Sequence, residues 1–209
     1  MPASMQLVKI WTIILLGIGY QTAAQSPPPS NLPPATPGVF TAQASIIIDA
    51  PIETAWEVLL DFPSYPEWNP FVRSQVVTNT LFIPLADQTP HESLRLIIQA
   101  QIPPLPLPVD ADTPPNLLHS QTSYENITTI DASSHRAAWR QIMIPGAVLN
   151  AERWQALSPV AGGGTYYEAR EVFSGPVGYV VETLFAEGLQ AGFEAQAVAF
   201  KARVEGLIY

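Results

Sequence analysis

The sequence predicts an α+β fold in which a curved antiparallel sheet wraps around one long C-terminal helix. Two observations lead to this prediction. Several strand patterns are separated by turn signals, and the final stretch, Val177–Glu205, has no proline and carries apolar residues at helical spacing. A helix of about 29 residues would extend for roughly 43 Å and needs a broad partner surface, which the strands supply. A sheet curved around a helix leaves an internal cavity, and such cavities bury apolar ligands.

The expected elements follow in a definite order. Residues 39–49 predict the first strand, and residues 52–60 predict an amphipathic helix that begins after Pro51. Three prolines between positions 63 and 70 limit any second helix to a turn or two. Residues 103–115 contain six prolines and are expected to form a long loop, which could cover the cavity mouth. Six further strands are expected at residues 71–80, 92–102, 116–130, 135–144, 151–157 and 165–173.

Two glycines in the final helix lead to a further prediction. Gly188 and Gly192 are four residues apart and therefore lie on one helix face. Each costs about 1 kcal/mol relative to alanine in a helix interior. A close approach of the sheet, or space for a ligand beside the helix, would offset that cost, and a simple bend would also explain the pair.

The composition excludes several classes of function. The chain of 209 residues is 47% hydrophobic and only 13% charged, which excludes global disorder. It has no cysteine, so disulfides, thiolate catalysis and cysteine-ligated metals are excluded. The net charge of −9 makes nucleic acid a poor partner, because binding there requires a basic surface.

The N-terminal residues predict a leader and a linker before the folded domain. Lys9 precedes the apolar run Ile10–Gly19, and small residues follow, so residues 1–24 resemble a cleaved signal peptide. An uncleaved anchor or an unstructured leader are the alternatives. The run is too short for a stable membrane span. Residues 25–38 are expected to form a proline-rich linker, and residues 39–209 the ligand-binding domain. This leader places the protein in the secretory pathway or outside the cell.

Several segments resemble the helix-grip superfamily, which includes START domains, birch-pollen-allergen-like proteins and polyketide cyclases and is also called SRPBCC. The resemblance covers residues 39–205, and its first signature follows the first strand. It is carried by residues 52–62, 65–71, 139–140, 145–146, 152–157, 164–165, 171–175, 192–195 and 200–203. Related sequences often carry a histidine and an aromatic residue where Arg153 and Gln155 stand, which implies a more polar cavity here. The resemblance implies the helix-grip fold, but this superfamily hosts carriers, cyclases, hydrolases and allergens.

Strand alternation selects the candidate catalytic residues. If Leu157 and Phe173 face inward, Arg153, Tyr167 and Glu171 also line the interior. A buried arginine requires an acid, so Arg153 and Glu171 are expected to pair. With Tyr167 they could polarise a carbonyl or move a proton, and a purely structural ion pair is the alternative.

Further residues are candidates for ligand contact rather than catalysis. They combine aromatic or apolar surface with a few polar groups, as small-molecule sites do. These candidates are Trp68, Arg95, Trp139, Gln155, Phe185 and Leu189. Asn126-Ile127-Thr128 is a glycosylation sequon in an expected strand, so its modification would require Asn126 to face outward.

The sequence leaves more than one function open. It has no phosphate-binding loop, serine-hydrolase elbow or zinc motif, so no cofactor or metal is expected. The first hypothesis is an enzyme that binds a hydrophobic small molecule and catalyses a cofactor-free cyclisation, isomerisation or lyase-type reaction in polyketide or terpenoid biosynthesis. The second is a non-catalytic carrier or sensor of a lipid or isoprenoid. A protein-interaction module that uses the acidic surface is the third. The oligomeric state is left open.

Overall fold

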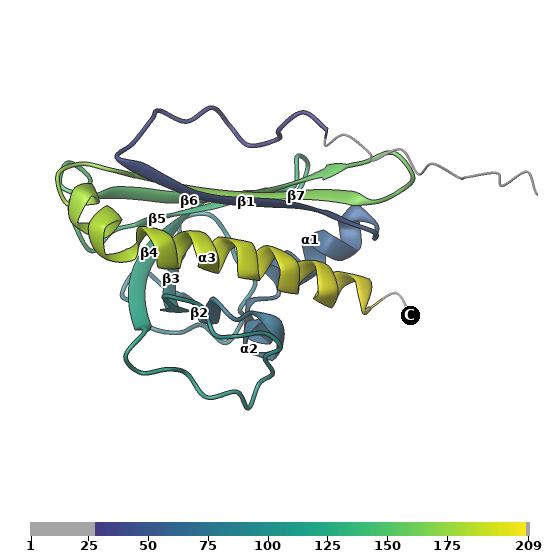
Figure 1. The fold of residues 1–209 in the computed structure, drawn as a ribbon, viewed down its shortest axis with the longest axis horizontal. Coiled ribbons are helices and arrows are strands. Elements are labelled where there is room, and N and C mark those ends of the chain that lie inside the picture. Colours follow the sequence, from purple (N-terminus) through teal and green to yellow (C-terminus); the bar gives the residue numbers. More distant parts are fainter. Residues whose placement is uncertain (1–27, 208–209) are drawn as a thin grey trace, which may run out of the picture.

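A computed structural model describes residues 28–207 of the chain. The predicted leader, residues 1–24, lies outside the described residues. The chain forms one seven-stranded antiparallel sheet in the order β1-β7-β6-β5-β4-β3-β2, with helices on one face (Figure 1). This is the predicted α+β helix-grip fold. Its elements are β1 (Phe40–Ile48), α1 (Ile52–Leu60), the 3-10 helix η1 (Phe62–Ser64), α2 (Tyr65–Trp68), β2 (Val72–Thr78), β3 (Arg95–Gln101), β4 (Ser120–Asp131), β5 (Arg136–Gln141), β6 (Asn150–Pro159), β7 (Thr165–Ser174) and α3 (Gly178–Glu205).

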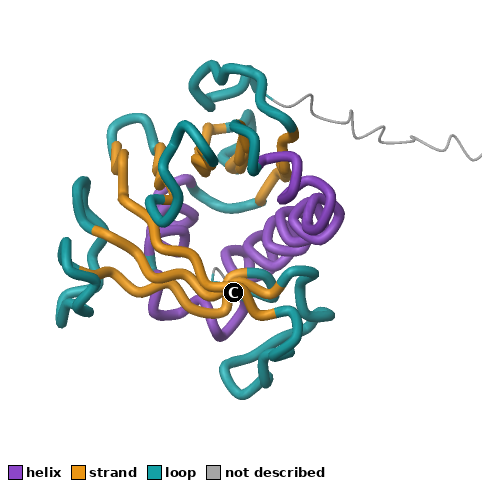
Figure 2. The backbone as a smooth tube through the Cα atoms, turned by 90° about the vertical axis from the view of Figure 1, so that its left-hand side faces the viewer, coloured by secondary structure: helices purple, strands orange, loops and turns teal. Residues whose placement is uncertain are grey.

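The sheet bends around the helices rather than lying flat against them (Figure 2). Strands β1 and β2 are its two edges, and α1, η1 and α2 connect them across the concave side. Alternating residues of each strand face α3, which is why Ala42 and Ile48 of β1 and Leu157 of β6 are buried in one apolar core. The segment that was expected to be a loop, residues 103–115, contains no helix or strand.

Only the second half of α3 is tightly buried. From Leu189 to Val204 the helix buries a stripe of side chains that includes Phe193 and Phe200. Between Tyr179 and Gly188 no residue of α3 is fully buried, and Tyr179 and Leu184 are exposed. The helix is therefore packed at its C-terminal half and only partly covered at its N-terminal half.

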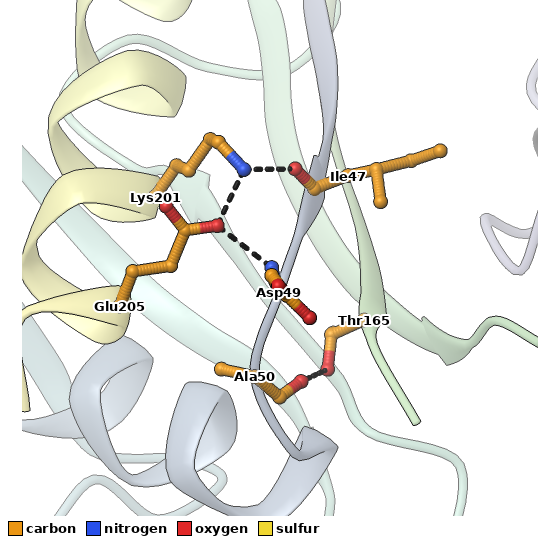
Figure 3. A network of polar contacts seen from close by, with 6 residues as sticks. All are labelled: Ile47, Asp49, Ala50, Thr165, Lys201 and Glu205. Atoms are coloured by element: carbon orange, nitrogen blue, oxygen red, sulfur yellow. Dashed lines mark hydrogen bonds and ion pairs between the residues drawn. The ribbon is translucent and has the colours of Figure 1, made fainter. Parts of the chain in front are cut away.

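A polar cluster fastens the C-terminal end of α3 to the end of β1 (Figure 3). The Nζ of Lys201 donates to the backbone oxygen of Ile47 at 2.8 Å, and it pairs with Glu205 one turn further along the helix. The same Glu205 carboxylate accepts the backbone N–H of Asp49 at 2.7 Å. These bonds supply partners to backbone groups at the sheet edge, where β1 has no neighbouring strand.

The proline-rich segment before β1 lies against the outer face of the sheet, on the side opposite α3 (Figure 1). Asn31 attaches it there. Its side-chain amide donates to the backbone oxygens of Ser134 at 2.7 Å and Leu157 at 2.8 Å, and its Oδ1 accepts from Arg136 at 2.8 Å. The described part of this segment, residues 28–38, has no regular secondary structure.

The two helix glycines mark close approaches of other segments. A Cβ at Gly192 would lie 2.5 Å from the Phe71 ring, and a Cβ at Gly188 would lie 2.8 Å from the side chain of Ile102. Of the explanations that the sequence left open, close packing is the one that the structure supports, because neither position faces empty space.

We therefore predict that Gly192→Ala destabilises the protein by about 1–3 kcal/mol, although alanine is the better helix former by about 1 kcal/mol. The Phe71 ring is buried and cannot move away freely. Urea unfolding measures the effect, with Thr183→Ala on the exposed face of α3 as the control. The control should be neutral or slightly stabilising. A Gly192→Ala protein that is as stable as Thr183→Ala would contradict the close approach.

Candidate functional site

A cavity of about 300 Å³ lies between the sheet and the N-terminal half of α3. This volume is at the lower end of the range for small-molecule sites, which is about 300–1,000 Å³. Helix α3 contributes Val181, Phe185 and Leu189 to its wall, and the loop between β5 and β6 contributes Met143 and Ile144. Strands β2 to β7 and a few residues at their ends, such as Phe71 and Ile102, supply the rest of the wall, which is largely apolar. Met143 is 65% exposed, so the cavity opens to solvent beside this loop.

Gln141 fixes the loop at the cavity mouth. Its side-chain amide donates to the backbone oxygen of Ile144 at 2.9 Å and to that of Leu149, and its Oε1 accepts the N–H of Ile144 at 3.1 Å. The proline-rich segment 103–115 does not cover this mouth: among the described residues, none of those that line the cavity belongs to it. It lies instead beside β2, where Arg73 donates to the backbone oxygens of Asp110 and Thr113.

Five of the predicted site residues line the cavity: Arg153 and Glu171 of the catalytic candidates, and Trp139, Phe185 and Leu189 of the ligand-contact candidates. The inward orientation that strand alternation predicted for these two charged residues is observed, and Leu157 and Phe173 on the same strands do face the core. Arg153 and Glu171 are directly opposite each other in the β6–β7 register.

The other four predicted residues lie outside the cavity wall. Tyr167 and Gln155 are fully buried behind it, where the Tyr167 hydroxyl donates to Gln155 Oε1 at 2.6 Å. Burial raises the pKa of Tyr167 above its ordinary value, so the Tyr167 hydroxyl is a poor acid at neutral pH. Trp68 packs in the core against Tyr65 and Phe200.

Arg95 faces the opposite side of the sheet from the cavity. Because Leu96 and Ile98 point into the core, the alternation of β3 directs Arg95 outward, where its guanidinium lies 4.8 Å from the centre of the Phe82 ring. Asn126, opposite Arg95 in the β3–β4 register, is on the same outer face, which is the orientation that its modification would require.

Arg153 does not form the expected ion pair with Glu171. Its Nη2 donates to Gln196 Oε1 of α3 at 3.0 Å, and its guanidinium lies over the Phe193 ring at 4.2 Å. Gln196 in turn donates to Gln155 Oε1 at 3.2 Å, which connects α3 to β6 and β7. Among the described residues, the three ion pairs involve neither Arg153 nor Glu171.

A second buried carboxylate, Glu125 of β4, also lines the cavity. Burial together with the negative charge of Glu171 raises its pKa to about 8, although the Ser123 hydroxyl donates to it at 2.8 Å. Burial also raises the pKa of Glu171 to about 7, against the opposing effect of the Arg153 charge. Near neutral pH each of these two carboxyls is therefore partly protonated, a state suited to acid–base chemistry.

Sequence reasoning missed Glu125, Gln75 and Gln196. Glu125 is two residues before Ile127, so the alternation that correctly placed Arg153 would also have placed Glu125 inside. Gln196 stands within the apolar stripe of α3, between Phe193 and Phe200, which was a signal of a buried polar group. Gln75 of β2 is 3% exposed and lines the cavity, and neither of its side-chain polar atoms has a hydrogen-bond partner in the described structure.

The described residues contain neither a metal-binding cluster nor a membrane-spanning helix. No cluster of three or more His, Cys, Asp or Glu side chains could hold a metal ion within residues 28–207. No helix in that range is both long enough and apolar enough to cross a membrane.

Comparisons with known proteins agree with the fold. Residues 39–96 match the family described as polyketide cyclase / dehydrase and lipid transport. No curated protein matches the chain significantly. A START superfamily protein from Mycobacterium smegmatis is 19% identical, with a TM-score of 0.51 over 80% of this chain and 98% of that chain. A norcoclaurine synthase from Thalictrum flavum, in complex with a transition-state analogue, is 12% identical, with a TM-score of 0.54 over 81% of this chain and 96% of that chain.

A protein from Thermus thermophilus is 16% identical, with a TM-score of 0.55 over 81% of this chain and 99% of that chain. At these levels of identity the structural likeness establishes a shared fold. It does not assign a substrate or a reaction, because one fold hosts many functions.

The two raised carboxyl pKa values predict that stability falls as the pH rises. The folded protein keeps protons on Glu125 and Glu171 that the unfolded chain, with ordinary glutamate pKa values near 4.5, releases. The stabilisation is therefore complete below about pH 4.5 and is lost as the pH passes through 7 and 8. We expect the free energy of unfolding to fall by several kcal/mol between about pH 5 and pH 9, as measured by urea unfolding.

The double variant Glu125→Gln/Glu171→Gln should abolish this slope, because its amides do not ionise. Glu152→Gln is the matched control: this glutamate of β6 pairs with Arg140 on the outer face, and the substitution should leave the slope unchanged. Equal slopes in the wild type and the double variant would show that these carboxyls are not the groups that titrate.

Proposed function

We propose that this protein is a member of the polyketide cyclase and lipid transport family, that it binds a hydrophobic small molecule in the cavity, and that it catalyses a cofactor-free cyclisation or isomerisation in natural-product biosynthesis. The observation that supports catalysis best is the pair Glu125 and Glu171, two buried carboxyls on one largely apolar cavity. The match of residues 39–96 to that family supports the ligand class.

The proposed chemistry requires only the side chains of the cavity. The ionised carboxylate removes a proton from a carbon beside a carbonyl group of the substrate, and the protonated carboxyl donates its proton to the oxygen. One C–H bond is replaced by one O–H bond, and the enzyme keeps the same number of protons. In a cyclisation, the enolate attacks a second carbonyl and the new alkoxide takes the donated proton. Such proton transfers contribute about 10²–10⁴-fold to a rate.

Arg153 would stabilise negative charge and would not transfer a proton. Its guanidinium is anchored by Gln196 and lines the cavity, so it can stabilise a developing oxyanion without reorganising. The apolar wall of α3, including Phe185 and Leu189, would hold the flexible substrate in a reactive shape.

A carrier or sensor of a lipid or isoprenoid is the second candidate. The observation that favours it is the composition of the wall, because most of the residues that line the cavity are apolar. A carrier and an enzyme would share the same ligand site. They differ in whether bonds of the bound molecule change.

Filling the cavity should weaken ligand binding. Ala151 lies on the cavity wall, so Ala151→Phe should weaken binding of the neutral apolar dye N-phenyl-1-naphthylamine by about tenfold or more, since it removes the volume that the dye occupies. Fluorescence titration measures the affinity, and circular dichroism confirms folding. Val198→Phe adds the same ring on the exposed face of α3 and should bind as the wild type does.

If Ala151→Phe fails to fold, Ala100→Phe, at another position on the wall, replaces it. Wild-type affinity in a folded cavity-filling variant would contradict the proposed binding site, and so would a wild-type protein that does not bind the dye.

Deuterium exchange separates the enzyme from the carrier. The compound that co-purifies with the full chain is incubated with the protein in D₂O and analysed by mass spectrometry. An enzyme that removes a carbon-bound proton should introduce deuterium, and Glu171→Gln should slow this exchange by about 100-fold or more. Glu152→Gln, on the outer face, should exchange at the wild-type rate. A compound that acquires no deuterium with the wild-type protein would contradict catalysis and favour the carrier.

A further inference from the structure

The positive and negative charges of the side chains that line the cavity do not cancel. Within the described residues they are Glu125, Arg153 and Glu171, all contributed by the sheet, while α3 contributes only apolar side chains. Two acids thus face one base. The other ionisable side chain on the wall is Tyr124.

The one base does not form an ion pair with either acid. Arg153 donates to Gln196 at 3.0 Å, and its guanidinium lies 4.2 Å and 5.4 Å from the ring centres of Phe193 and Phe71. It is not within ion-pair distance of either carboxylate among the described residues. The two acids consequently retain capacity to accept hydrogen bonds from a ligand, since an ionised carboxylate can accept several.

Gln75 is an independent indication that a polar ligand group binds here. Its side chain is 97% buried on the wall of the same cavity, and both amide atoms lack a partner in the described structure. A buried amide without hydrogen bonds costs about 1–3 kcal/mol, so such groups normally have a partner. Because both atoms are free, exchanging the amide oxygen and nitrogen leaves this conclusion unchanged.

We infer that the cavity selects an apolar molecule that carries a positively charged nitrogen, and that Glu125 and Glu171 bind this nitrogen with the oxygen of Gln75 as a further acceptor. An ammonium group has three N–H donors, which matches these three acceptors. With both carboxylates ionised, Arg153 and the ligand cation bring the net charge of the cluster to zero. An anionic ligand would instead add a third negative charge. This inference rests on the ligand-binding part of the proposed function, and it specifies the class of molecule that the cavity binds.

Three probes with the same ten-carbon chain test the inference on the full-length protein: decylamine, decanol and decanoate. Displacement of N-phenyl-1-naphthylamine gives their affinities. Near pH 8 we expect decylamine to bind about tenfold or more tightly than decanol, and decanoate to bind most weakly, because charge-assisted hydrogen bonds are the stronger ones. The affinity for decylamine should rise between about pH 6 and pH 8, as the cation displaces protons from the two carboxyls, whereas the affinity for decanol should not.

The variants separate this inference from the proposed function. Glu125→Gln/Glu171→Gln should lose the preference for decylamine over decanol, and Glu152→Gln on the outer face should behave as the wild type. If decanol binds but decylamine binds no more tightly, or if the double variant keeps the preference, the inference is wrong while the proposed apolar site stands. If neither the dye nor any of the three probes binds, both are wrong.

Discussion

The packing of α3 across the bent sheet is the constraint on which the rest of the structure depends. At its C-terminal half the helix lies close to the sheet and the first helices, with Gly192 against Phe71, and with Lys201 bonded to the edge of β1. At its N-terminal half it lacks fully buried residues between Tyr179 and Gly188, and there the cavity lies beneath it. Helix α3 thus closes the apolar core with its C-terminal half and covers the cavity with its N-terminal half.

Arg153 marks the boundary between these two halves. On one side its guanidinium contacts Phe193 and Gln196 of the packed half, and on the other it lines the cavity. Buried charges of this kind do little for stability, because apolar residues of similar volume often stabilise a core equally well or better. Burying Glu125 and Glu171 in the same apolar wall costs folding free energy, and a role of these groups in acting on a ligand would explain why the cost is tolerated. Carboxyls with perturbed pKa values are found preferentially at functional sites.

The order of the elements could be predicted because each has a local signal. Helix α3 has a stripe of apolar residues, and the strands are separated by prolines and glycines. The same alternation placed Arg153 and Glu171, whose strands carry clear core residues. It could not place Arg95, because Leu94, Leu96 and Ile97 surround it with apolar residues on both faces, and the inward side of β3 is decided by pairing with β2 and β4.

The sequence also could not predict whether an inward-facing residue lines the cavity or lies in the packed core. Tyr167 and Gln155 face inward as expected, yet they lie behind the cavity, in the half that α3 fills. Their position depends on where α3 packs closely, which involves residues far apart in the chain. Alternation from Ile127 would have placed Glu125 inside, but β4 is polar on both faces near its start, and the raised pKa of Glu125 depends on the charge of Glu171 on a distant strand.

Native mass spectrometry of the full-length protein, isolated gently from its source organism, tests most directly whether the cavity is a ligand site. We expect the protein to carry one small molecule, and denaturation to release a compound with an apolar body and a basic nitrogen. A protein that is isolated empty and takes up none of the apolar probes would contradict the central claim. It would mean that the space beneath the N-terminal half of α3 is a packing defect rather than a site.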